Sequence, residues 1–583
     1  MLHTLTRSLR ENKGPALVTV LLSALEVVFE IVIPLFMSNL IDFGIEGGSM
    51  AAVWKFGAFL LLLAAFQLST GVLAARIAAR ASVGFAANLR EDMYNNVQTF
   101  AFSNIDKFST ASIITRLTTD TTNVQNAFQM LMRMAIRAPV MLIFSMIVSF
   151  RISRDISMTF LIILPILALA LFFIIRSVFP VFSRVFRTYD ELNNVVQENV
   201  RGIRVVKSFN QERHEIGKFG AISERIYKDF SKGERLITLN APLMQFCIYT
   251  CMIVISWLGA KAIIASGNDP ALGFTTGNLT ALITYTMQIL SSLMMLSMVF
   301  AMLTISLSSA RRIAEVLEER SDIPQPEQPV MTVRDGAVDF DHVSFVYASK
   351  ADKKVLDDID LHIRSGETIG IIGGTGASKS SLVQLIPRLY DVTGGKLTLG
   401  GVDVRDYDLD TLRGAVAMVL QKNELFSGTI AENLRWGNEN ATDEQLRHAC
   451  KLACADGFIS AMPDGYDTHI EQGGTNVSGG QKQRLCIARA LLKKPKVLIL
   501  DDSTSAVDTR TDAQIQQALS TYIPDTTKII IAQRISSVQN ADRIVVLDDG
   551  HIDAVGCHDE LLRTCEIYRE VYESQQKGGE DDA

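Results

Sequence analysis

The clearest chemistry in the chain lies in two adjacent acids, Asp501 and Asp502, which follow the apolar run Val497 to Leu500. Four apolar residues that end in an acid predict a buried strand that delivers a carboxylate to a magnesium ion. Asp502 stands where a nucleotide hydrolase needs a Glu to orient the attacking water, and Asp is one methylene shorter. Gln533 stands where a His would be expected to contact the γ-phosphate. These residues predict a chain that binds ATP, hydrolyses it poorly alone and forms half of an unequal pair.

A phosphate cradle is predicted upstream of these acids. A strand at Glu367 to Ile372 runs into a Gly-rich loop, after which an apolar helix begins. Backbone N–H groups of such a loop face phosphate, while Lys379 reaches the β- and γ-phosphates and Ser380 is a ligand of Mg²⁺. The alternative, a Gly-rich turn without a ligand, is disfavoured by the strand and helix on either side. The residues expected to bind ATP here are Gly373, Gly374, Thr375, Gly376, Ala377, Ser378, Lys379, Ser380 and Ser381.

A second anion site is predicted at Ser478, Gly479, Gly480 and Gln481, which open a helix that runs to Leu492. Small residues at a helix N-terminus leave backbone N–H groups free to face an anion. The segment lies too far along the chain from the Gly-rich loop to belong to the same cradle. We therefore expect this segment to bind the γ-phosphate of ATP that another subunit holds.

Composition divides the chain into two domains. Its 583 residues exceed what one core can organise, and its net charge of −7 gives no sign of nucleic-acid binding. The seven cysteines form no CxxC pair or metal-ligand pattern, so we expect reduced thiols. Apolar runs predict a transmembrane domain at residues 1–320, followed by a Pro-containing linker at 321–334 and a nucleotide-binding domain at 335–576. A disordered acidic tail is expected at 577–583.

Six membrane spans are predicted from stretches that approach the length of a bilayer core. The first, Ala16 to Ile41, is interrupted by two acids. The third, Ala138 to Phe150, reaches full length only if the helix begins near Phe128 and accepts Arg133 and Arg137. The other four are uncharged and lie at Phe56 to Ala75, Ile156 to Ile175, Leu236 to Ala260 and Pro270 to Ala310.

Lys and Arg near the span ends predict that both termini and the nucleotide-binding domain are cytosolic. The segment Arg187 to Arg235 is rich in these residues, whereas Gly44 to Val53, after the first span, has none. Arg76 to Gln125 and Arg187 to Arg235 are long, polar and helical in period. We therefore expect the spans to extend into the cytosol and turn back through short transverse helices near Phe100 to Phe108 and Phe209 to Phe219.

The ordered set of motifs resembles one family. The C-terminal half resembles the nucleotide-binding domain of ATP-binding cassette (ABC) transporters, and the six spans with long cytosolic extensions resemble the exporter type of half-transporter. The resemblance implies an all-α membrane domain whose helices are exchanged between subunits, followed by an α/β P-loop ATPase that uses ATP and Mg²⁺. It also assigns roles to single residues. These are a stacking aromatic at Tyr347, Mg²⁺ ligands at Ser380, Gln421 and Asp501, a catalytic role for Gln421 in sensing the attacking water, a signature at Ser478 to Gln481 that completes the partner's site, and an interface loop at Ser505 to Asp508.

The departures from the family pattern point to a particular subunit. Asp502 and Gln533 replace the usual Glu and His, Ser378 replaces a Gly at some conformational cost, and Thr468 to Gly474 departs from the usual acidic interface loop. This combination is similar to the degenerate-site subunit of bacterial heterodimeric multidrug exporters. In those proteins one composite site hydrolyses ATP and the other mainly holds it. The resemblance implies a second half-transporter as partner and a location in the bacterial plasma membrane.

Substrate signals are confined to the spans. Met287, Met294 and Met298 share one helical face, which suits an adaptable apolar surface, although ordinary packing or lipid contact explains them as well. Glu26 and Glu30 lie one turn apart in the first span. Intramembrane acids indicate a functional site, here for cationic amphiphiles, unless the pair is held by neighbouring helices.

The leading interpretation is ATP-driven export of hydrophobic drugs or lipid-like compounds. A lipid or peptide exporter, or an importer built on the exporter fold, remains open. A membrane-tethered regulatory subunit that senses ATP is the alternative of another class. ATP-dependent substrate movement into inverted vesicles, measured with a partner present, distinguishes transport from regulation.

Overall fold

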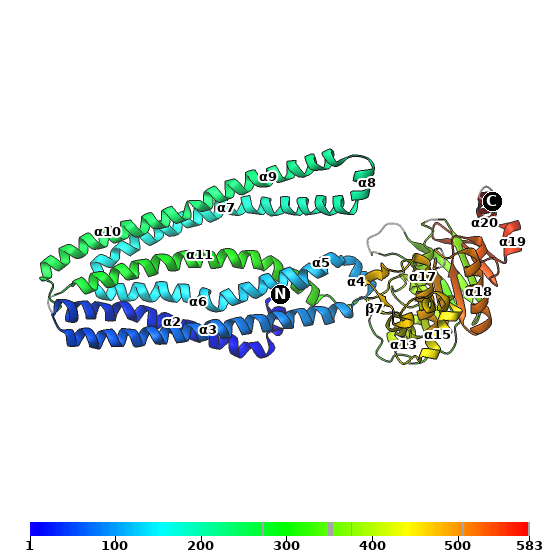
Figure 1. Cartoon of the computed structure of the whole chain (residues 1–583), viewed down its shortest axis with the longest axis horizontal. Coiled ribbons are helices and arrows are strands. Elements are labelled where there is room, and N and C mark those ends of the chain that lie inside the picture. The colour runs from blue at the N-terminus through cyan, green and yellow to red at the C-terminus, as the bar shows by residue number, and fades with distance from the viewer. Residues whose placement is uncertain (271–272, 348–353, 375, 504–505, 581–583) are drawn as a thin grey trace. The chain divides into compact units, whose positions relative to one another are not determined.

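The computed structural model describes residues 1–583 except 271–272, 348–353, 375, 504–505 and 581–583. The described chain forms two compact units. The first comprises Met1–Gln98 and Thr110–Glu319, and the second comprises Thr99–Ser109 and Arg320–Ala583 (Figure 1). We call them the membrane unit and the nucleotide unit and describe each by itself.

Within its described residues, the membrane unit contains helices and no strand. Its helices are α1 (Leu2–Arg7), α2 (Lys13–Asn39), α3 (Met50–Gln98), α5 (Thr110–Thr115), α6 (Thr121–Ile152), α7 (Arg154–Arg201), α8 (Ile203–Ser208), α9 (Glu212–Thr238), α10 (Asn240–Ser266) and α11 (Thr276–Glu318). A 3₁₀ turn at Arg10–Asn12 and π-helical turns at Leu40–Glu46 and Arg116–Asp120 continue α2 and α6 at their ends.

The predicted number of spans is confirmed for the described part of the chain, in which six helical stretches are long and apolar enough to cross a bilayer. They are Arg10–Glu46, Met50–Gln98, Thr110–Ile152, Arg154–Arg201, Glu212–Ser266 and Thr276–Glu318. The third span is lengthened as predicted, because α6 runs without a break past Arg133 and Arg137. Ser153 alone, with an extended φ of −153°, separates α6 from α7 within the described chain.

The interior of the membrane unit is apolar. Phe160, Ile255 and Ile289 are fully buried, and the buried Tyr285 hydroxyl donates to the Ile31 carbonyl at 2.6 Å. Large apolar side chains also cover the outside, for example Leu61 at 75% exposure. Apolar residues on both faces are expected of helices that are solvated by lipid, where every backbone polar group is satisfied within the helix.

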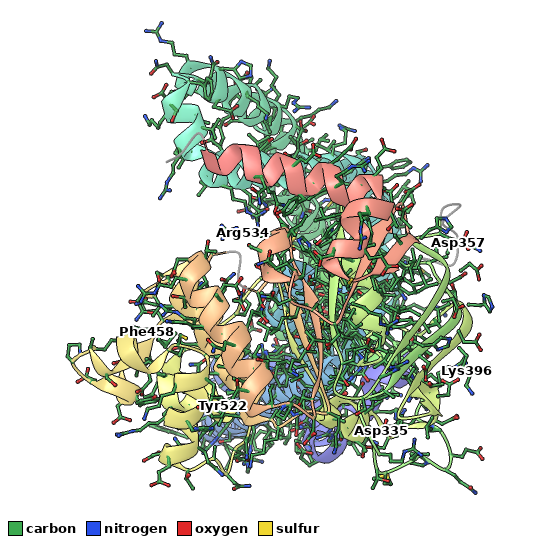
Figure 2. The ribbon with its side chains drawn as sticks, turned by 90° about the vertical axis from the view of Figure 1, so that its right-hand side faces the viewer. Asp335, Asp357, Lys396, Phe458, Tyr522 and Arg534 are labelled. Carbon is green, nitrogen blue, oxygen red and sulfur yellow. The ribbon has the colours of Figure 1, made fainter. Side chains whose placement is uncertain are left out.

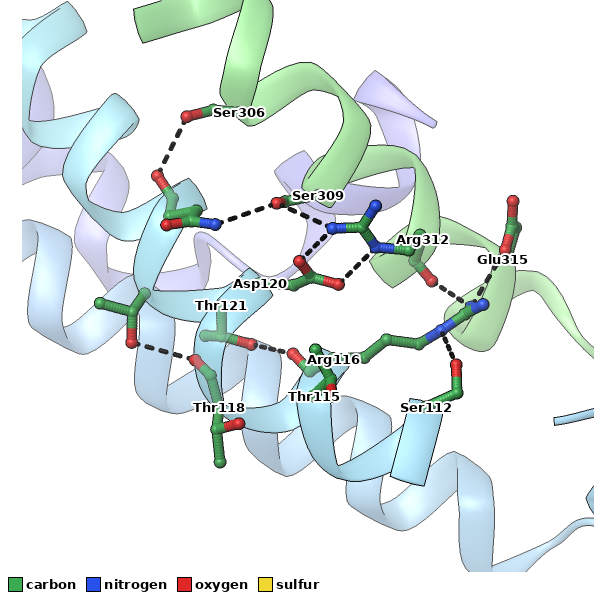
Figure 3. A network of polar contacts seen from close by, with 12 residues as sticks. Ser112, Thr115, Arg116, Thr118, Asp120, Thr121, Ser306, Ser309, Arg312 and Glu315 are labelled. Carbon is green, nitrogen blue, oxygen red and sulfur yellow. Dashed lines mark hydrogen bonds and ion pairs between the residues drawn. The ribbon is translucent and has the colours of Figure 1, made fainter. Parts of the chain in front are cut away.

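A polar network joins the beginning of α6 to the end of α11 (Figure 3). Asp120 is only 1% exposed and accepts a hydrogen bond from Arg312 Nε at 2.7 Å. Arg116 donates to the Arg312 carbonyl at 2.6 Å and pairs with Glu315 at 3.0 Å. Because buried charges are stable only when they are paired and hydrogen-bonded, these contacts fix the register of α6 against α11. The last turns of α11 therefore have a defined position immediately before the linker.

The second transverse helix lies upstream of its predicted place. The short helix is α8, which joins α7 to α9 where these two helices run side by side (Figure 1). The prediction of a transverse helix at Phe209 to Phe219 was wrong, because Gly202 ends α7 and the turn falls at Asn210, whose φ is +51°. Phe209 does not mark a packed helix, since its side chain is 69% exposed.

The nucleotide unit is built on two main sheets. In the described residues, an antiparallel sheet has the order β2-β1-β4-β5, and a mostly parallel sheet has the order β12-β11-β3-β10-β9-β6, with β12 antiparallel at its edge. The strands are β1 (Val338–Phe345), β2 (Leu356–Ile363), β3 (Thr368–Gly373), β4 (Gly394–Leu399), β5 (Val402–Asp403), β6 (Val416–Val419), β9 (Val497–Asp501), β10 (Thr527–Ile531), β11 (Arg543–Asp548) and β12 (His551–Gly556), with a small pair β7 (Gly428–Thr429) and β8 (His469–Ile470).

Helices lie around these sheets. We call the side that carries the antiparallel sheet the antiparallel side, and the side that carries α16 the helical side. Figure 2 shows Lys396 of β4 and Phe458 of α16 on opposite sides of the unit. The helices are α4 (Phe102–Lys107), α12 (Lys379–Leu385), α13 (Leu409–Ala415), α14 (Ile430–Arg435), α15 (Asp443–Leu452), α16 (Asp456–Ser460), α17 (Gly479–Leu492), α18 (Thr509–Tyr522), α19 (His558–Thr564) and α20 (Glu566–Glu580).

The first short helix, α4, forms where it was predicted, and it packs within the nucleotide unit. The Tyr390 hydroxyl donates to Asp106 Oδ2 at 2.7 Å, and the rings of Phe102 and Tyr390 lie 6.0 Å apart. Asn104 donates to the Arg320 carbonyl at 2.9 Å, which ties α4 to the start of the linker. At the other end of the unit, α20 continues to Glu580 and so covers the first residues of the stretch predicted as a disordered tail.

Candidate nucleotide site

The site forms where three parallel strands end. β3 leads into the Gly-rich loop, β9 ends at Asp501, and β10 leads to Gln533. Ile531 of β10 is in register with Asp501 on one side and with Ile371 of β3 on the other. Since ligands of open α/β sheets bind beyond the carboxyl ends of the strands, this register gathers the predicted nucleotide residues at one edge.

The Gly-rich loop has the conformation expected of a phosphate cradle. Gly376 has a φ of +89°, and a Cβ on Gly373 would lie 2.1 Å from the Leu547 carbonyl oxygen, so neither position accepts a larger residue without strain. Lys379 Nζ donates to the carbonyls of Gly373 at 2.9 Å and Gly374 at 2.7 Å. The predicted loop residue Thr375 lies outside the described residues.

Lys379 and Asp501 form the electrostatic centre of the site. Burial lowers the pKa of Lys379, while the charges of Asp501 and Asp502 raise it. Burial likewise raises the pKa of Asp501, while a hydrogen bond from Ser380 and the charge of Lys379 lower it. Two acids beside one lysine leave the site without excess positive charge, so a polyphosphate would be neutralised here by Lys379 together with a metal ion.

The predicted magnesium ligands fit that ion. Ser380, Gln421 and Asp501 supply a hydroxyl, an amide and a carboxylate, and Mg²⁺ prefers oxygen ligands completed by phosphate oxygens and water. The Ser380 hydroxyl and the Asp501 carboxylate are adjacent, and Asp501 is 3% exposed. In the described part of the chain, no group of three or more His, Cys, Asp or Glu side chains could hold a metal.

Ser378 occupies a left-handed conformation, with φ +64° and ψ +21°. We expect Ser378→Gly to raise the free energy of unfolding of the nucleotide unit by about 0.5–1 kcal/mol, because Gly relieves the backbone strain but enlarges the unfolded ensemble. Thermal unfolding and equilibrium ATP binding measure the effect. The matched control is Ser520→Gly on the exposed face of α18, where the same substitution should lower stability because the backbone is helical. A loss of stability in Ser378→Gly would contradict the interpretation.

The two departures from the hydrolase pattern contact each other. Gln533 Nε2 donates to Asp502 Oδ2 at 2.7 Å, and Gln421 Nε2 donates to the same oxygen at 3.3 Å. Asp502 has a φ of +49° and is 8% exposed. Asp tolerates the left-handed region better than most residues, so the shorter acid also suits this backbone. The carboxylate at the predicted catalytic position thus accepts hydrogen bonds from two neutral amides.

Tyr347 has the placement expected of a stacking residue. Its side chain is 45% exposed, and its ring packs edge-on against Phe345 at 4.8 Å and Tyr390 at 5.1 Å. Its hydroxyl shares a 2.8 Å hydrogen bond with the Ser381 hydroxyl, which links the aromatic to the helix that follows the Gly-rich loop. A half-exposed ring held on two sides can accept a flat base on its remaining face.

The signature residues form the first turn of α17 in a capping box. The Ser478 N–H donates to Gln481 Oε1 at 2.9 Å, and the Gln481 N–H donates to Ser478 Oγ at 3.3 Å. Ser478 and Gly479 are exposed, whereas the body of α17 packs in the core of the helical side. The motif therefore presents its N-terminus outward.

The structure brings the interface loop onto this turn. Ala506 N–H donates to Gln483 Oε1 at 3.0 Å, and a Cβ on Gly480 would lie 2.8 Å from the Ala506 carbonyl oxygen. Gln483 is 5% exposed, and sequence reasoning did not identify it because an amide in a helix has no signature of its own. Asp508 accepts from the Thr511 N–H at 2.9 Å and caps α18. The predicted interface residue Ser505 lies outside the described residues.

The acids of the first span are paired. Arg137 Nη1 donates to Glu26 Oε1 at 2.8 Å, and Arg137 Nη2 donates to Glu30 Oε2 at 2.7 Å. Arg137 lies in the third span. The sequence predicted that this span contains Arg137 but did not predict its partners. The fork of one guanidinium matches two carboxylates one turn apart. This geometry favours the alternative in which neighbouring helices hold the pair, over an unneutralised site for cations.

The methionine face is open in this chain. Met287, Met294 and Met298 are 47%, 40% and 64% exposed, while Ile289 on the opposite face of α11 is buried. The helix therefore packs on its other side and leaves the methionines available to lipid, to a partner or to a ligand.

Comparisons with known proteins cover both units. The profile of the ABC transporter transmembrane region matches residues 16–308, and the profile of the ABC transporter ATP-binding domain, described as "ABC transporter", matches residues 356–505. The uncharacterized ABC transporter ATP-binding protein YfiB of Bacillus subtilis is 35% identical over 96% of this chain and 96% of its own length. The uncharacterized ABC transporter ATP-binding protein MT1311 of Mycobacterium tuberculosis is 33% identical over 99% of this chain and 98% of its own length.

A solved structure shares the fold. The structure of a bacterial Atm1-family ABC exporter with ATP bound covers 97% of this chain and 99% of its own chain with a TM-score of 0.82. The sequence identity is 23%, so this likeness concerns the fold alone.

Proposed function

The chain belongs to the ABC transporter family as an exporter-type half-transporter, an ATPase whose activity is coupled to transport, and from this premise we propose that it is one subunit of a heterodimeric exporter. Its own nucleotide site retains ATP and hydrolyses it slowly. Its Ser478 to Gln481 completes the hydrolytic site of the partner. The cargo is a hydrophobic drug or lipid-like compound that is moved out across a bacterial plasma membrane.

The observation that carries the proposal is the hydrogen bond from Gln533 Nε2 to Asp502 Oδ2. A carboxylate that orients water must present a lone pair to it, and the amides of Gln533 and Gln421 both occupy lone pairs of this oxygen. The Asp side chain also ends about 1.5 Å short of the reach of Glu, and a misplacement of that size lowers a rate by roughly 100-fold. Gln533 can donate to a γ-phosphate but cannot carry a positive charge toward it.

A partner is indicated by the outward-facing signature. Exposed Ser478 and Gly479 open α17, where backbone N–H groups can face the γ-phosphate of ATP bound to another subunit. ABC exporters act as dimers, so each nucleotide is held between two chains. In a homodimer both sites would carry Asp502 and Gln533, whereas a heterodimer needs only one competent site.

A groove on the nucleotide unit supports exchange of helices between subunits. Its volume is about 260 Å³, and it is lined among others by Val419, Phe426, Trp436 and Arg489. The rings of Phe426 and Trp436 stack at 4.1 Å, and Trp436 is 65% exposed. We propose that a short cytosolic helix of the partner subunit occupies this groove, as the expected domain-swapped arrangement requires.

Transport in the proposed cycle follows from a shift between an open and a closed pair of nucleotide domains. ATP bound at both interfaces favours the closed pair of nucleotide domains, and hydrolysis at the competent site releases it. Retention of ATP at this chain's site keeps one interface engaged between turnovers. The exposed methionine face of α11 is the proposed contact for apolar cargo, since methionine adapts to ligands of different shape.

ATPase turnover of the purified chain, measured first alone and then with a candidate half-transporter, tests the proposal. We expect near-zero turnover alone and strong turnover in the pair. Ser478→Ala in this chain should then slow the pair, because the signature serves the partner's site. Robust turnover of the chain alone as a homodimer would overturn the heterodimer. Nucleotide binding in a pair that moves no substrate into inverted vesicles would overturn export in favour of a regulatory subunit.

A further inference from the structure

A side chain of the C-terminal helix reaches the turn that carries Gln533. Gln575 Nε2 donates to the Gln533 carbonyl at 2.7 Å, and the Ile535 N–H donates to Gln575 Oε1 at 2.9 Å. Figure 2 shows Arg534, the residue between these two contacts, at the turn beside α20. One planar amide thereby satisfies a backbone acceptor and a backbone donor two residues apart, which fixes both ends of the turn.

The helix that carries Gln575 is itself anchored. Tyr568 is fully buried in the core of the helical side, and its hydroxyl lies 2.7 Å from His558 Nδ1. Val571 and Tyr572 pack against the same core. Together with Gln575 these residues occupy positions i, i+3, i+4 and i+7, so they share one face of α20. Gln575 therefore extends a packed helix face and is held in place by it.

The contacts continue from the turn into the site. Gln533 accepts from Gln575 through its carbonyl and donates from its own side chain to Asp502 Oδ2. A continuous path of hydrogen bonds thus runs from α20 through Gln575 and Gln533 to the acid beside Asp501. The path joins residues that are 31 and 42 positions apart in the sequence.

We propose that Gln575 is a positioning residue of the nucleotide site. By fixing the backbone at Gln533, it holds the Gln533 amide where that amide contacts both Asp502 and the γ-phosphate of bound ATP. The C-terminal helix then contributes to the nucleotide site through the backbone at Gln533. The inference rests on the proposed position of Gln533 beside the γ-phosphate, and it holds whether this site hydrolyses ATP or only retains it.

Release of methylanthraniloyl-AMPPNP with Mg²⁺ from the full-length chain in nanodiscs measures the effect without hydrolysis. Gln575→Ala is expected to accelerate release about fivefold, the change that loss of an ordinary hydrogen bond produces. The matched control is Gln576→Ala, which removes the same side chain from the next position. Gln576 donates to the Tyr572 hydroxyl within α20, so its removal should leave the release rate unchanged. Equal rates in the Gln575→Ala and unmodified chains would overturn the proposal.

A double substitution separates positioning from a loss of helix packing. If Gln575 acts through Gln533, then Gln575→Ala should change release no further in a chain that already carries Gln533→Ala. Additive effects, or a fall in thermal stability that accounts for the faster release, would assign Gln575 a structural role and overturn the proposal. A Gln533→Ala chain with unchanged release would instead refute the placement of Gln533 beside the γ-phosphate.

Discussion

Chains that carry Asp502→Glu together with Gln533→His are expected to hydrolyse ATP at their own site roughly 100-fold faster than the unmodified chain. Glu restores the reach that Asp lacks, and an imidazole can carry a positive charge toward the γ-phosphate, which the Gln533 amide cannot do. The paired substitution also removes the Gln533 amide, one of the two that donate to Asp502 Oδ2 in the present site. Steady-state ATPase, measured on the chain alone and on a pair whose partner has an inactivated P-loop, reports turnover at this site.

The single substitutions are the controls for this gain. Asp502→Glu alone should give a smaller increase, because Glu is less favourable than Asp in the left-handed conformation that residue 502 adopts, with φ +49°. Gln533→His alone leaves the short acid in place. Nucleotide binding, measured in parallel, shows that each variant keeps its site. A double variant that binds ATP normally and gains no turnover would show that neither residue limits hydrolysis.

Arg137→Gln is expected to lower the stability of the membrane unit by about 3–5 kcal/mol, the range seen when one partner of a buried ion pair is removed. Arg137 is the cation that contacts both Glu26 and Glu30, and Glu26 has only 10% of its side chain exposed. Without it, the two carboxylates one turn apart lose the cation that pairs with both of them. The apparent unfolding temperature in nanodiscs, with and without a cationic dye, measures the loss.

Removal of the acids separates structure from recognition. The triple variant Glu26→Gln, Glu30→Gln and Arg137→Gln should regain most of the stability that Arg137→Gln loses, since no charge is then left unpaired. In transport assays, Glu26→Gln with Glu30→Gln should slow cationic and neutral substrates equally if the triad is structural. A selective loss of cationic dye transport would contradict this expectation and indicate that the two acids recognise the substrate.

The sequence by itself determined the class of the protein and most of its nucleotide chemistry. Gly373 to Ser380, Asp501 and Ser478 to Gln481 are local patterns, in which a strand, a turn and a helix start follow one another directly, so they can be identified without knowledge of distant contacts. The spans are equally local, because length and apolarity alone decide whether a helix crosses a bilayer. Asp502 and Gln533 could be recognised as departures from the family pattern, because the neighbouring motifs show which positions of that pattern these two residues occupy.

Tertiary structure decided which distant residues meet. Arg137 lies 111 positions from Glu26, and Gln575 lies 42 positions from Gln533, so no local pattern announces either contact. Asp120 meets Arg312 across 192 positions for the same reason. The position of the second short helix also depended on a turn at Asn210, where one left-handed residue overrides the apolar spacing of the neighbouring segment. Side-chain amides and guanidinium groups are common on helices, and only their partners across the fold give them a role.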